Sequence, residues 1–181
     1  MSRTAAIKNY IMKIKKEGFY ICKTGWFGSG VYFYKNNIEK ALEWSKKKYK
    51  SNNCVIEINL KIENKFVFDV TNVNGEDARI FHRIRKELIE QMKKVGILAI
   101  VSKKNFDNIV FNYISKKLKK QVIIGNSFTY DEYDIPSRVP NGIGICIIDI
   151  KASPHSRWHL QIGEQRLSTM VARPNSHSFV V

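Results

Sequence analysis

The sequence is short of acidic residues, cysteine and long apolar runs, and each shortage excludes a class of protein. Its 181 residues include 16 aspartates and glutamates against 31 lysines and arginines, a formal net charge of +15 at pH 7. The three cysteines, at positions 22, 54 and 146, suit neither a disulfide framework nor a zinc site. No segment has the ~18 consecutive apolar residues that suggest a membrane span, and the charged N-terminus lacks the apolar core of a signal peptide. We therefore expect a reduced, cytoplasmic protein without a membrane partner.

The excess of positive charge predicts an anionic partner. A net charge of this size attracts polyanions, so nucleic acid is the first partner to expect, with an acidic protein or a membrane surface second. The alternative is a solvated surface in a protein whose lysine-rich composition reflects its genome. The densest lysine clusters lie at 46–50 and 116–120.

Hydrophobic periodicity predicts a single α+β domain over residues 1–151. Helical spacing or strict alternation of apolar residues marks most of its elements. The expected elements are helices at 4–17, 38–49 and 76–95, and strands at 54–62, 65–70, 97–101, 121–130 and 143–151. Residues 106–118 fit a helix or a strand, with the helix preferred. This mixed order favours an α+β fold over a regular array of alternating strands and helices.

The last thirty residues differ in composition, and we predict a distinct C-terminal tail at 152–181. The last lysine is Lys151, whereas three of the four histidines, His155, His159 and His177, fall in this tail. His155 and His159 are four residues apart but lack a third ligand, and Pro154 disfavours a helix there. No metal site is therefore expected.

The stretch Gly25–Tyr34, GWFGSGVYFY, contains three glycines and five aromatic residues. A dinucleotide-binding loop would need a third glycine where Phe33 stands, and a Walker-type loop would need Gly-Lys-Ser/Thr, which is absent. The pattern is typical of a strand entry, where Gly28 and Gly30 remove side chains and Tyr32 and Tyr34 share one face. Composition alone favours aromatics that pack in the core, and the other interpretation is a site for a flat ligand.

Residues 4–70 resemble the ADP-ribosyltransferase superfamily in its poly-ADP-ribose-polymerase-like, or H-Y-E, branch. The resemblance rests on the order of three segments: EGF at 17–19, FGSGVYFY followed by a helix, and the alternating strand CVIEINLKI. It implies a split antiparallel or mixed sheet with flanking helices, and a cleft that binds NAD as substrate.

The resemblance implies a role for each residue of the motif. Nicotinamide would stack on Tyr32, because an aromatic face attracts a planar cation. Bare backbone at the glycines would bond the carboxamide at close range. The NAD-binding set would comprise Gly28, Ser29, Gly30, Tyr32 and Tyr34.

The family's other two motifs are matched less closely. The His-Gly-Thr/Ser motif has only Ser2-Arg3-Thr4 as its counterpart, so that Thr4 would supply the hydroxyl and Arg3 would contact the phosphates. The catalytic carboxylate would stabilise the oxocarbenium-like state formed as the nicotinamide–ribose bond breaks. Glu132, in the acidic loop before the last strand, is the first candidate, and Asp107 in FDNIVFN is the second. From the residues alone, Glu132 also fits a solvated turn and Asp107 a helix cap.

The resemblance implies an NAD-dependent ADP-ribosyltransferase, a glycosyltransferase that modifies a macromolecular acceptor. The positive charge makes nucleic acid the preferred acceptor, with protein second. A small basic enzyme of this kind fits a toxin or defence effector held by an acidic antitoxin-like partner. The alternatives are a catalytically degenerate nucleic-acid-binding module, whose tyrosines stack bases, and an NAD-dependent RNA 2′-phosphotransferase.

Overall fold

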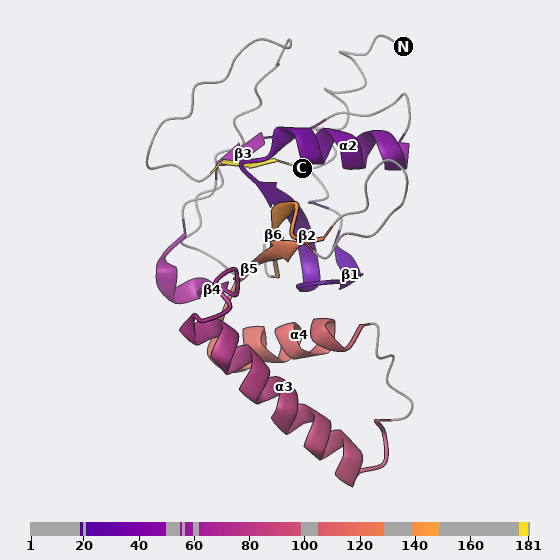
Figure 1. Cartoon of the computed structure of the whole chain (residues 1–181), viewed down its shortest axis with the longest axis vertical. Helices are drawn as coiled ribbons and strands as arrows, with labels where there is room; N and C mark the ends of the chain where they lie inside the picture. Colours follow the sequence, from indigo (N-terminus) through magenta and orange to yellow (C-terminus); the bar gives the residue numbers. More distant parts are fainter. Residues whose placement is uncertain are drawn as a thin grey trace.

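A computed structural model describes residues 19, 21–49, 55, 57–59, 62–98, 105–128, 139–148 and 178–180. They form a single α+β domain with a mixed sheet, as the sequence predicts. Within the described residues, three α-helices flank the sheet: α2 (Ile38–Tyr49), α3 (Glu76–Lys94) and α4 (Phe106–Leu118). Figure 1 shows α2 at one end of the molecule and α3 and α4 together at the other.

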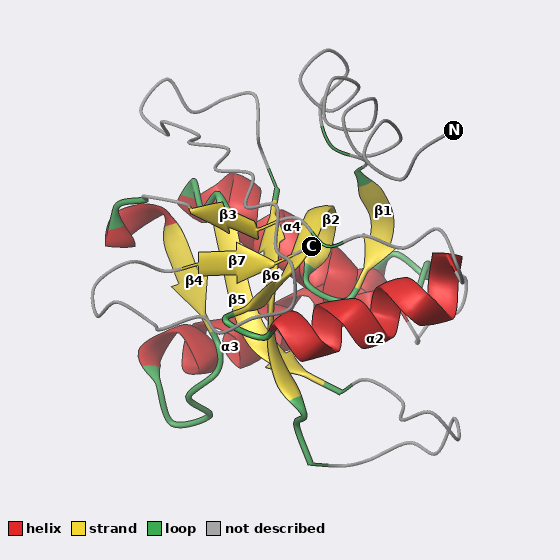
Figure 2. Cartoon of the chain, turned by 90° about the horizontal axis from the view of Figure 1, so that it is seen from above, coloured by secondary structure: helices red, strands yellow, loops and turns green. Residues whose placement is uncertain are grey.

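The described strands join one sheet in the order β3-β7-β2-β6-β5-β4, with β1 paired to β2 (Figure 2). Their bounds are β1 Cys22–Gly25, β2 Gly28–Lys35, β3 Glu57–Asn59, β4 Val67–Asp69, β5 Val122–Ser127, β6 Gly142–Ile147 and β7 Ser178–Val180. A short 3-10 helix, Asn64–Phe66, leads into β4. Among the described strands, β4 and β5 form the one parallel pair.

The motif strand β2 separates two apolar clusters, which confirms the predicted alternation. Val31 and Phe33 are buried on one face with residues of β5 and β6. Tyr32 packs on the other face, where α3 and α4 supply most of the buried side chains. The strand lies inside the sheet, because it pairs with β6 on one side and with β1 and β7 on the other.

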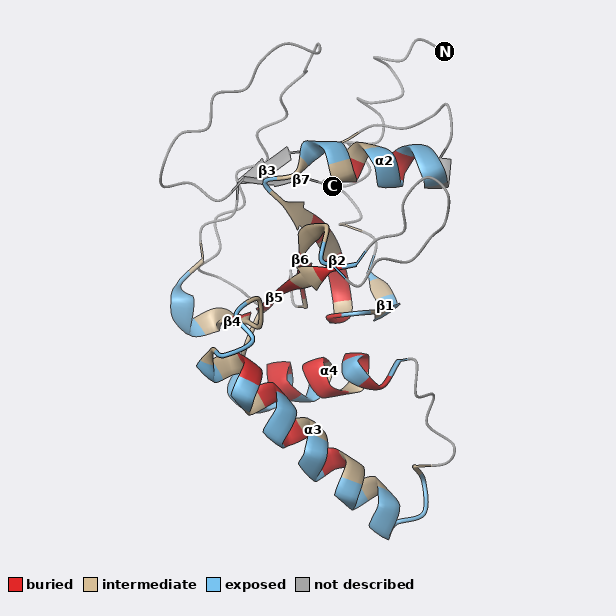
Figure 3. Ribbon diagram, viewed as in Figure 1, coloured by how far each residue is buried: buried red, intermediate tan, exposed pale blue. Residues whose placement is uncertain are grey.

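The described helices begin and end at the predicted residues or within one residue of them. Asn37 caps α2, since its side-chain oxygen accepts a hydrogen bond from the amide of Lys40 at 2.9 Å. The segment that fitted either a helix or a strand is the helix α4, because its apolar residues at helical spacing are buried together against the sheet and α3. Figure 3 shows this burial along α4 and the exposed outer side of α3.

The predicted strand at 97–101 is wrong in its described part. Ile97 and Leu98 follow α3 outside any strand, and Ile97 is 43% exposed. The amide of Ile97 bonds back to the carbonyl of Met92, and Gly96 adopts a positive φ of 72°. Ile97 therefore closes the helix end in the manner of a Schellman motif, which uses the amide that a strand would need.

Parts of other predicted elements lie outside the described residues. These are the helix at 4–17, residues 54, 56, 60 and 61 of the strand at 54–62, residues 99–101, and most of the loop between β5 and β6. Residues 55 and 62 are described and lie outside the strand β3. Of the predicted tail at 152–181, Ser178–Val180 is described, and it forms β7 between β3 and β2.

Two glycines opposite each other in the sheet make room for the ring of Phe27. Gly125 on β5 pairs with Gly144 on β6. A Cβ atom at either position would lie 2.5 or 2.6 Å from a carbon of the Phe27 ring. Phe27 is 8% exposed and packs edge-on against Phe111 of α4, with ring centroids 5.9 Å apart. The glycines thus let the turn between β1 and β2 fold against the sheet.

The substitution Gly144→Ala should lower the free energy of unfolding by about 1–3 kcal/mol, because the new methyl group must displace the buried ring. Gly142→Ala is the matched control in the same strand, since its Cβ would meet only Tyr34, at 3.7 Å, and Ser127, at 4.0 Å. Urea unfolding of both variants measures the difference. Equal stability of the two variants would contradict the packing role of Gly144.

Candidate functional site

Tyr32, the tyrosine of the motif, is half-buried within the hairpin formed by β1 and β2. Its hydroxyl donates a hydrogen bond to the carbonyl of Gly28 and accepts one from the amide of Phe27, both at 2.7 Å. Its ring lies nearly parallel to that of Phe27, with centroids 6.3 Å apart and planes at 19°. A Cβ atom at Gly25 would collide with the hydroxyl end of the ring. Tyr32 therefore holds the hairpin turn in place.

The glycines beside Tyr32 also have structural roles. Gly28 has a φ of +105°, which a side chain would strain, and it begins β2 directly after the turn. A Cβ atom at Gly30 would collide with the carbonyl of Ile147 on the neighbouring strand. Both positions therefore need glycine for the chain geometry alone.

Two asparagines of α4 fasten the hairpin to the helix. The side-chain oxygen of Asn112 accepts a bond from the amide of Ser29 at 2.8 Å, and its nitrogen donates to the Ser29 hydroxyl at 3.1 Å. Asn108, 9% exposed, donates to the carbonyl of Gly25 at 2.7 Å and accepts from Asn112 at 2.9 Å. The Ser29 hydroxyl completes the network by donating to the carbonyl of Lys23 at 2.7 Å. The amide and the hydroxyl of Ser29, a residue that the resemblance assigns to NAD binding, are thus hydrogen-bonded within the chain.

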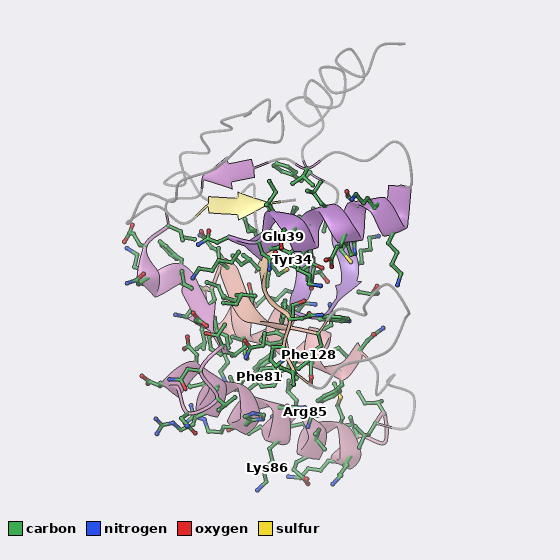
Figure 4. The ribbon with its side chains drawn as sticks, turned by 45° about the horizontal axis from the view of Figure 1, so that its top comes forward. Tyr34, Glu39, Phe81, Arg85, Lys86 and Phe128 are labelled. Carbon is green, nitrogen blue, oxygen red and sulfur yellow. The ribbon has the colours of Figure 1, made fainter. Side chains whose placement is uncertain are left out.

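Tyr34 lies two residues further along the same face of β2. Burial, with a smaller contribution from the carboxylate of Glu43, raises the pKa of its hydroxyl, and a hydrogen bond with Ser127 partly opposes this rise. Its ring approaches Gly142, where the sheet carries no side chain. Figure 4 labels Tyr34 near the end of the sheet that lies towards α2.

Of the two candidate carboxylates, Asp107 lies within the described residues and Glu132 does not. Asp107 lies in the first turn of α4, and its carboxylate accepts a charged hydrogen bond from Nε of Arg85 on α3 at 2.9 Å. Its side chain is 56% exposed. No hydrogen bond or ion pair joins Tyr32 to a carboxylate in the described part of the chain. Glu132, Arg3 and Thr4 lie outside the described residues.

The outer side of α3 carries a cationic stripe that the sequence analysis missed. Arg79, Arg83 and Lys86 are exposed and follow one another at spacings of four and three residues. Residues at these spacings lie on one side of a helix. The signal was present, because the three positions lie opposite the buried set Ala78, Phe81, Ile84 and Leu88. In Figure 4, Lys86 projects outward from α3.

The lysines of the two predicted clusters are not all exposed and available to a ligand. Lys46 and Lys47 are exposed on α2, whereas the side chain of Lys48 and the whole of Lys50 lie outside the described part of the chain. At the end of α4, Lys120 donates to the backbone carbonyls of Lys65 and Val67 at 3.0 and 2.9 Å. Lys120 therefore ties α4 to the start of β4. The exposed lysines of this second cluster are Lys116, Lys117 and Lys119.

A cavity of about 490 Å³ lies on the outer side of α3 and is open to solvent over much of its boundary. Its lining comprises Glu76, Arg79, Ile80 and Arg83, all from this one helix, and two of them belong to the stripe. Nη2 of Arg79 donates to the carbonyl of Asn74 at 3.0 Å, a bond that orients the guanidinium without neutralising it. Arg83 makes no ion pair within the described residues. The cavity therefore combines two positive guanidinium groups, one carboxylate and one apolar side chain.

Within the described ranges, no three His, Cys, Asp or Glu side chains come together as a metal site. No helix in that part of the chain is long and apolar enough to cross a membrane. Comparisons with models of protein families, with curated proteins and with solved structures found no match to this chain. The motif in the sequence remains the one link to the ADP-ribosyltransferases.

The buried thiol of Cys146, which packs beside Tyr32, predicts a loss of stability at alkaline pH. Burial raises its pKa from 9.0 to about 12. Above pH 9 the unfolded chain releases this proton while the folded chain keeps it, so ionisation favours unfolding. The free energy of unfolding should lose up to about 1.4 kcal/mol per pH unit from this group above pH 9, and nothing below it.

Urea unfolding between pH 8 and about pH 9.5 measures this slope, because nearer pH 10 Tyr32 and Tyr34, whose pKa values burial also raises from 10.0, would add to it. Cys146→Ala is the comparison variant. It should be less stable at pH 8 because of the lost packing, but its stability should fall less steeply above pH 9. Parallel slopes for the two proteins would contradict the assignment.

Proposed function

We propose that this protein binds nucleic acid through the outer side of α3. The observation that carries the proposal is the stripe of Arg79, Arg83 and Lys86. Within the described residues, none of the three forms an ion pair, and the one hydrogen bond from Arg79 goes to a neutral backbone carbonyl. Three cations without an ion pair, on one side of one helix, match the repeated negative charge of a phosphate backbone.

The surroundings of the stripe strengthen this proposal. Other exposed charges on α3 are partly balanced, since Lys93 pairs with Glu90 at 3.2 Å. The formal net charge of +15 would steer a polyanion towards the protein from any direction. The stripe would then supply the fixed contacts, because its side chains extend from a helix whose other side is packed against the core.

The first test compares binding of a labelled single-stranded oligonucleotide by fluorescence anisotropy at several salt concentrations. The comparison variant is the triple variant Arg79→Ala, Arg83→Ala, Lys86→Ala. If the three side chains contact phosphates, the plot of log affinity against log salt concentration should be steeper for the wild-type protein, with a slope about 2 units more negative than that of the triple variant. Lys46→Ala on α2 is the control for loss of a positive charge elsewhere, and it should shift the slope far less. Full affinity and an unchanged slope in the triple variant would contradict the proposal.

A second candidate function, compatible with the first, is transfer of ADP-ribose from NAD to the bound acceptor. It is favoured by the placement of the motif: the strand with Gly28, Gly30 and Tyr32 lies inside a mixed sheet and is followed directly by α2, the order that the resemblance implies. In this reaction the bond from nicotinamide nitrogen to ribose C1′ breaks, its electron pair leaves with nicotinamide, and a nucleophile of the acceptor bonds to C1′ and loses its proton.

NAD binding in the manner of the family would require a rearrangement at the hairpin. The ring of Phe27 already lies nearly parallel to that of Tyr32, and the backbone at Gly25 lies against its hydroxyl end. A stacked nicotinamide would have to displace them. Tyr34 is the other aromatic residue on this face. Arg3 and Thr4 would approach the phosphates and a ribose hydroxyl, and Glu132 would stabilise the positive charge that develops on the ribose.

Release of nicotinamide from NAD, with RNA, DNA or protein as acceptor, tests this candidate. If Glu132 is the catalytic carboxylate, Glu132→Gln should reduce release by about 10²–10³-fold. Asp107→Asn should retain most of the activity, because Asp107 is engaged by Arg85. Absence of release with every acceptor would reject the enzyme and leave the binding proposal intact.

A further inference from the structure

We infer that the cavity on α3 binds a phosphorylated ribose, so that the protein prefers RNA to DNA. The inference deepens the proposed function and rests on it, because it assigns a sugar specificity to the same side of the helix. At the cavity, two arginines that can bind phosphate lie together with a carboxylate that can bind a hydroxyl group.

Arg79 and Arg83 supply the phosphate half of the site. They are four residues apart on α3, so their guanidinium groups are neighbours on the helix surface, and both line the cavity. A guanidinium presents paired N–H donors whose geometry matches two oxygens of one phosphate group. The bond from Arg79 to the carbonyl of Asn74 uses one nitrogen and leaves the rest of the group available.

Glu76 supplies the sugar half. Its carboxylate lines the cavity and is exposed, and within the described residues it forms neither a hydrogen bond nor an ion pair, although Arg79 lies one turn away. Its position in the first turn is favourable for the helix dipole. Beside a bound phosphate it would repel charge unless it received a donor. A ribose hydroxyl is a donor attached close to the phosphate, and the 2′-hydroxyl is the group that DNA lacks.

The size and the remaining wall of the cavity suit one nucleotide. Its volume of about 490 Å³ leaves room for a nucleotide, whose outer side would stay in contact with solvent because the cavity is open. Ile80 is half-buried and gives the cavity an apolar side chain against which a sugar or base could pack. The cavity thus offers cations for a phosphate, an acceptor for a hydroxyl and an apolar contact, the three chemical parts of a ribonucleotide.

The test measures the affinity of the full chain for RNA and DNA oligonucleotides of the same sequence at one salt concentration. The wild-type protein should bind RNA more tightly by about tenfold, the effect of one hydrogen bond to a charged group. Glu76→Gln should bring the RNA-to-DNA ratio close to one while leaving the affinity for DNA equal or higher, because it removes a negative charge. Glu87→Gln, an exposed acid of α3 outside the cavity, should leave the ratio unchanged.

Equal binding of RNA and DNA by the wild-type protein, or an unchanged ratio in Glu76→Gln, would overturn the inference. Either result would leave the proposed function standing, provided that the triple variant still loses affinity. If instead the triple variant binds RNA and DNA as tightly as the wild-type protein, the proposed function itself is contradicted.

Free nucleotides and RNA share the chemistry that the cavity would recognise, and competition separates the two sources. Adenosine 3′-monophosphate and its 2′-deoxy analogue, called AMP and dAMP below, keep the phosphate beside the 2′ position as in RNA. They are added to the complex with labelled RNA, with inorganic phosphate as the reference for simple displacement by charge. Displacement by AMP at lower concentrations than by dAMP supports a cavity that binds the free nucleotide as well. Displacement by neither, with the RNA preference retained, supports recognition within the polymer. Equal displacement by both, with no RNA preference, contradicts the site.

Discussion

The ring of Phe27 can reach the sheet only because Gly125 and Gly144 face each other without side chains. This contact draws the turn between β1 and β2 against the core, where the hydroxyl of Tyr32 bonds to the amide of Phe27 and to the carbonyl of Gly28. The asparagines of α4 can then reach the hairpin backbone, and their hydrogen bonds join strand and helix into one unit. A buried polar network of this kind is stable only when each member is satisfied, and no described buried side chain lacks a partner.

The same contact determines which surface is left for a ligand. Phe111 of α4 packs against Phe27 on one side and against Phe81 of α3 on the other, with centroids 5.9 and 4.6 Å apart. The ion pair between Arg85 and Asp107 joins the two helices at their edge. With its inner side committed in this way, α3 presents its remaining side to solvent, as Figure 3 shows. The cationic stripe is therefore held in a fixed orientation by the core beneath it.

Much of the fold follows from sequence periodicity, and much of the site does not. The bounds of α3 and the alternation of Val31, Tyr32 and Phe33 could be read from apolar spacing, which reflects burial directly. The role of Gly125 and Gly144 could not, because glycine within a strand signals a close approach without naming the partner, and Phe27 is about a hundred residues away. The prediction at Ile97 failed for a related reason: its apolar character fitted a strand, but its amide was needed to end α3.

The chemical assignments divide along the same line. The motif tyrosine was recognisable from its neighbours in the sequence, whereas its bonds to the turn depend on the folded hairpin. The stripe on α3 was recognisable from its spacing but was obscured by the denser lysine clusters.

The most direct test of nucleic-acid binding by α3 is an NMR titration of backbone amides with a short single-stranded RNA. We expect shifts at Arg79, Arg83 and Lys86 with little change at Phe27 and Tyr32. Shifts centred on the hairpin, with α3 unaffected, would contradict it.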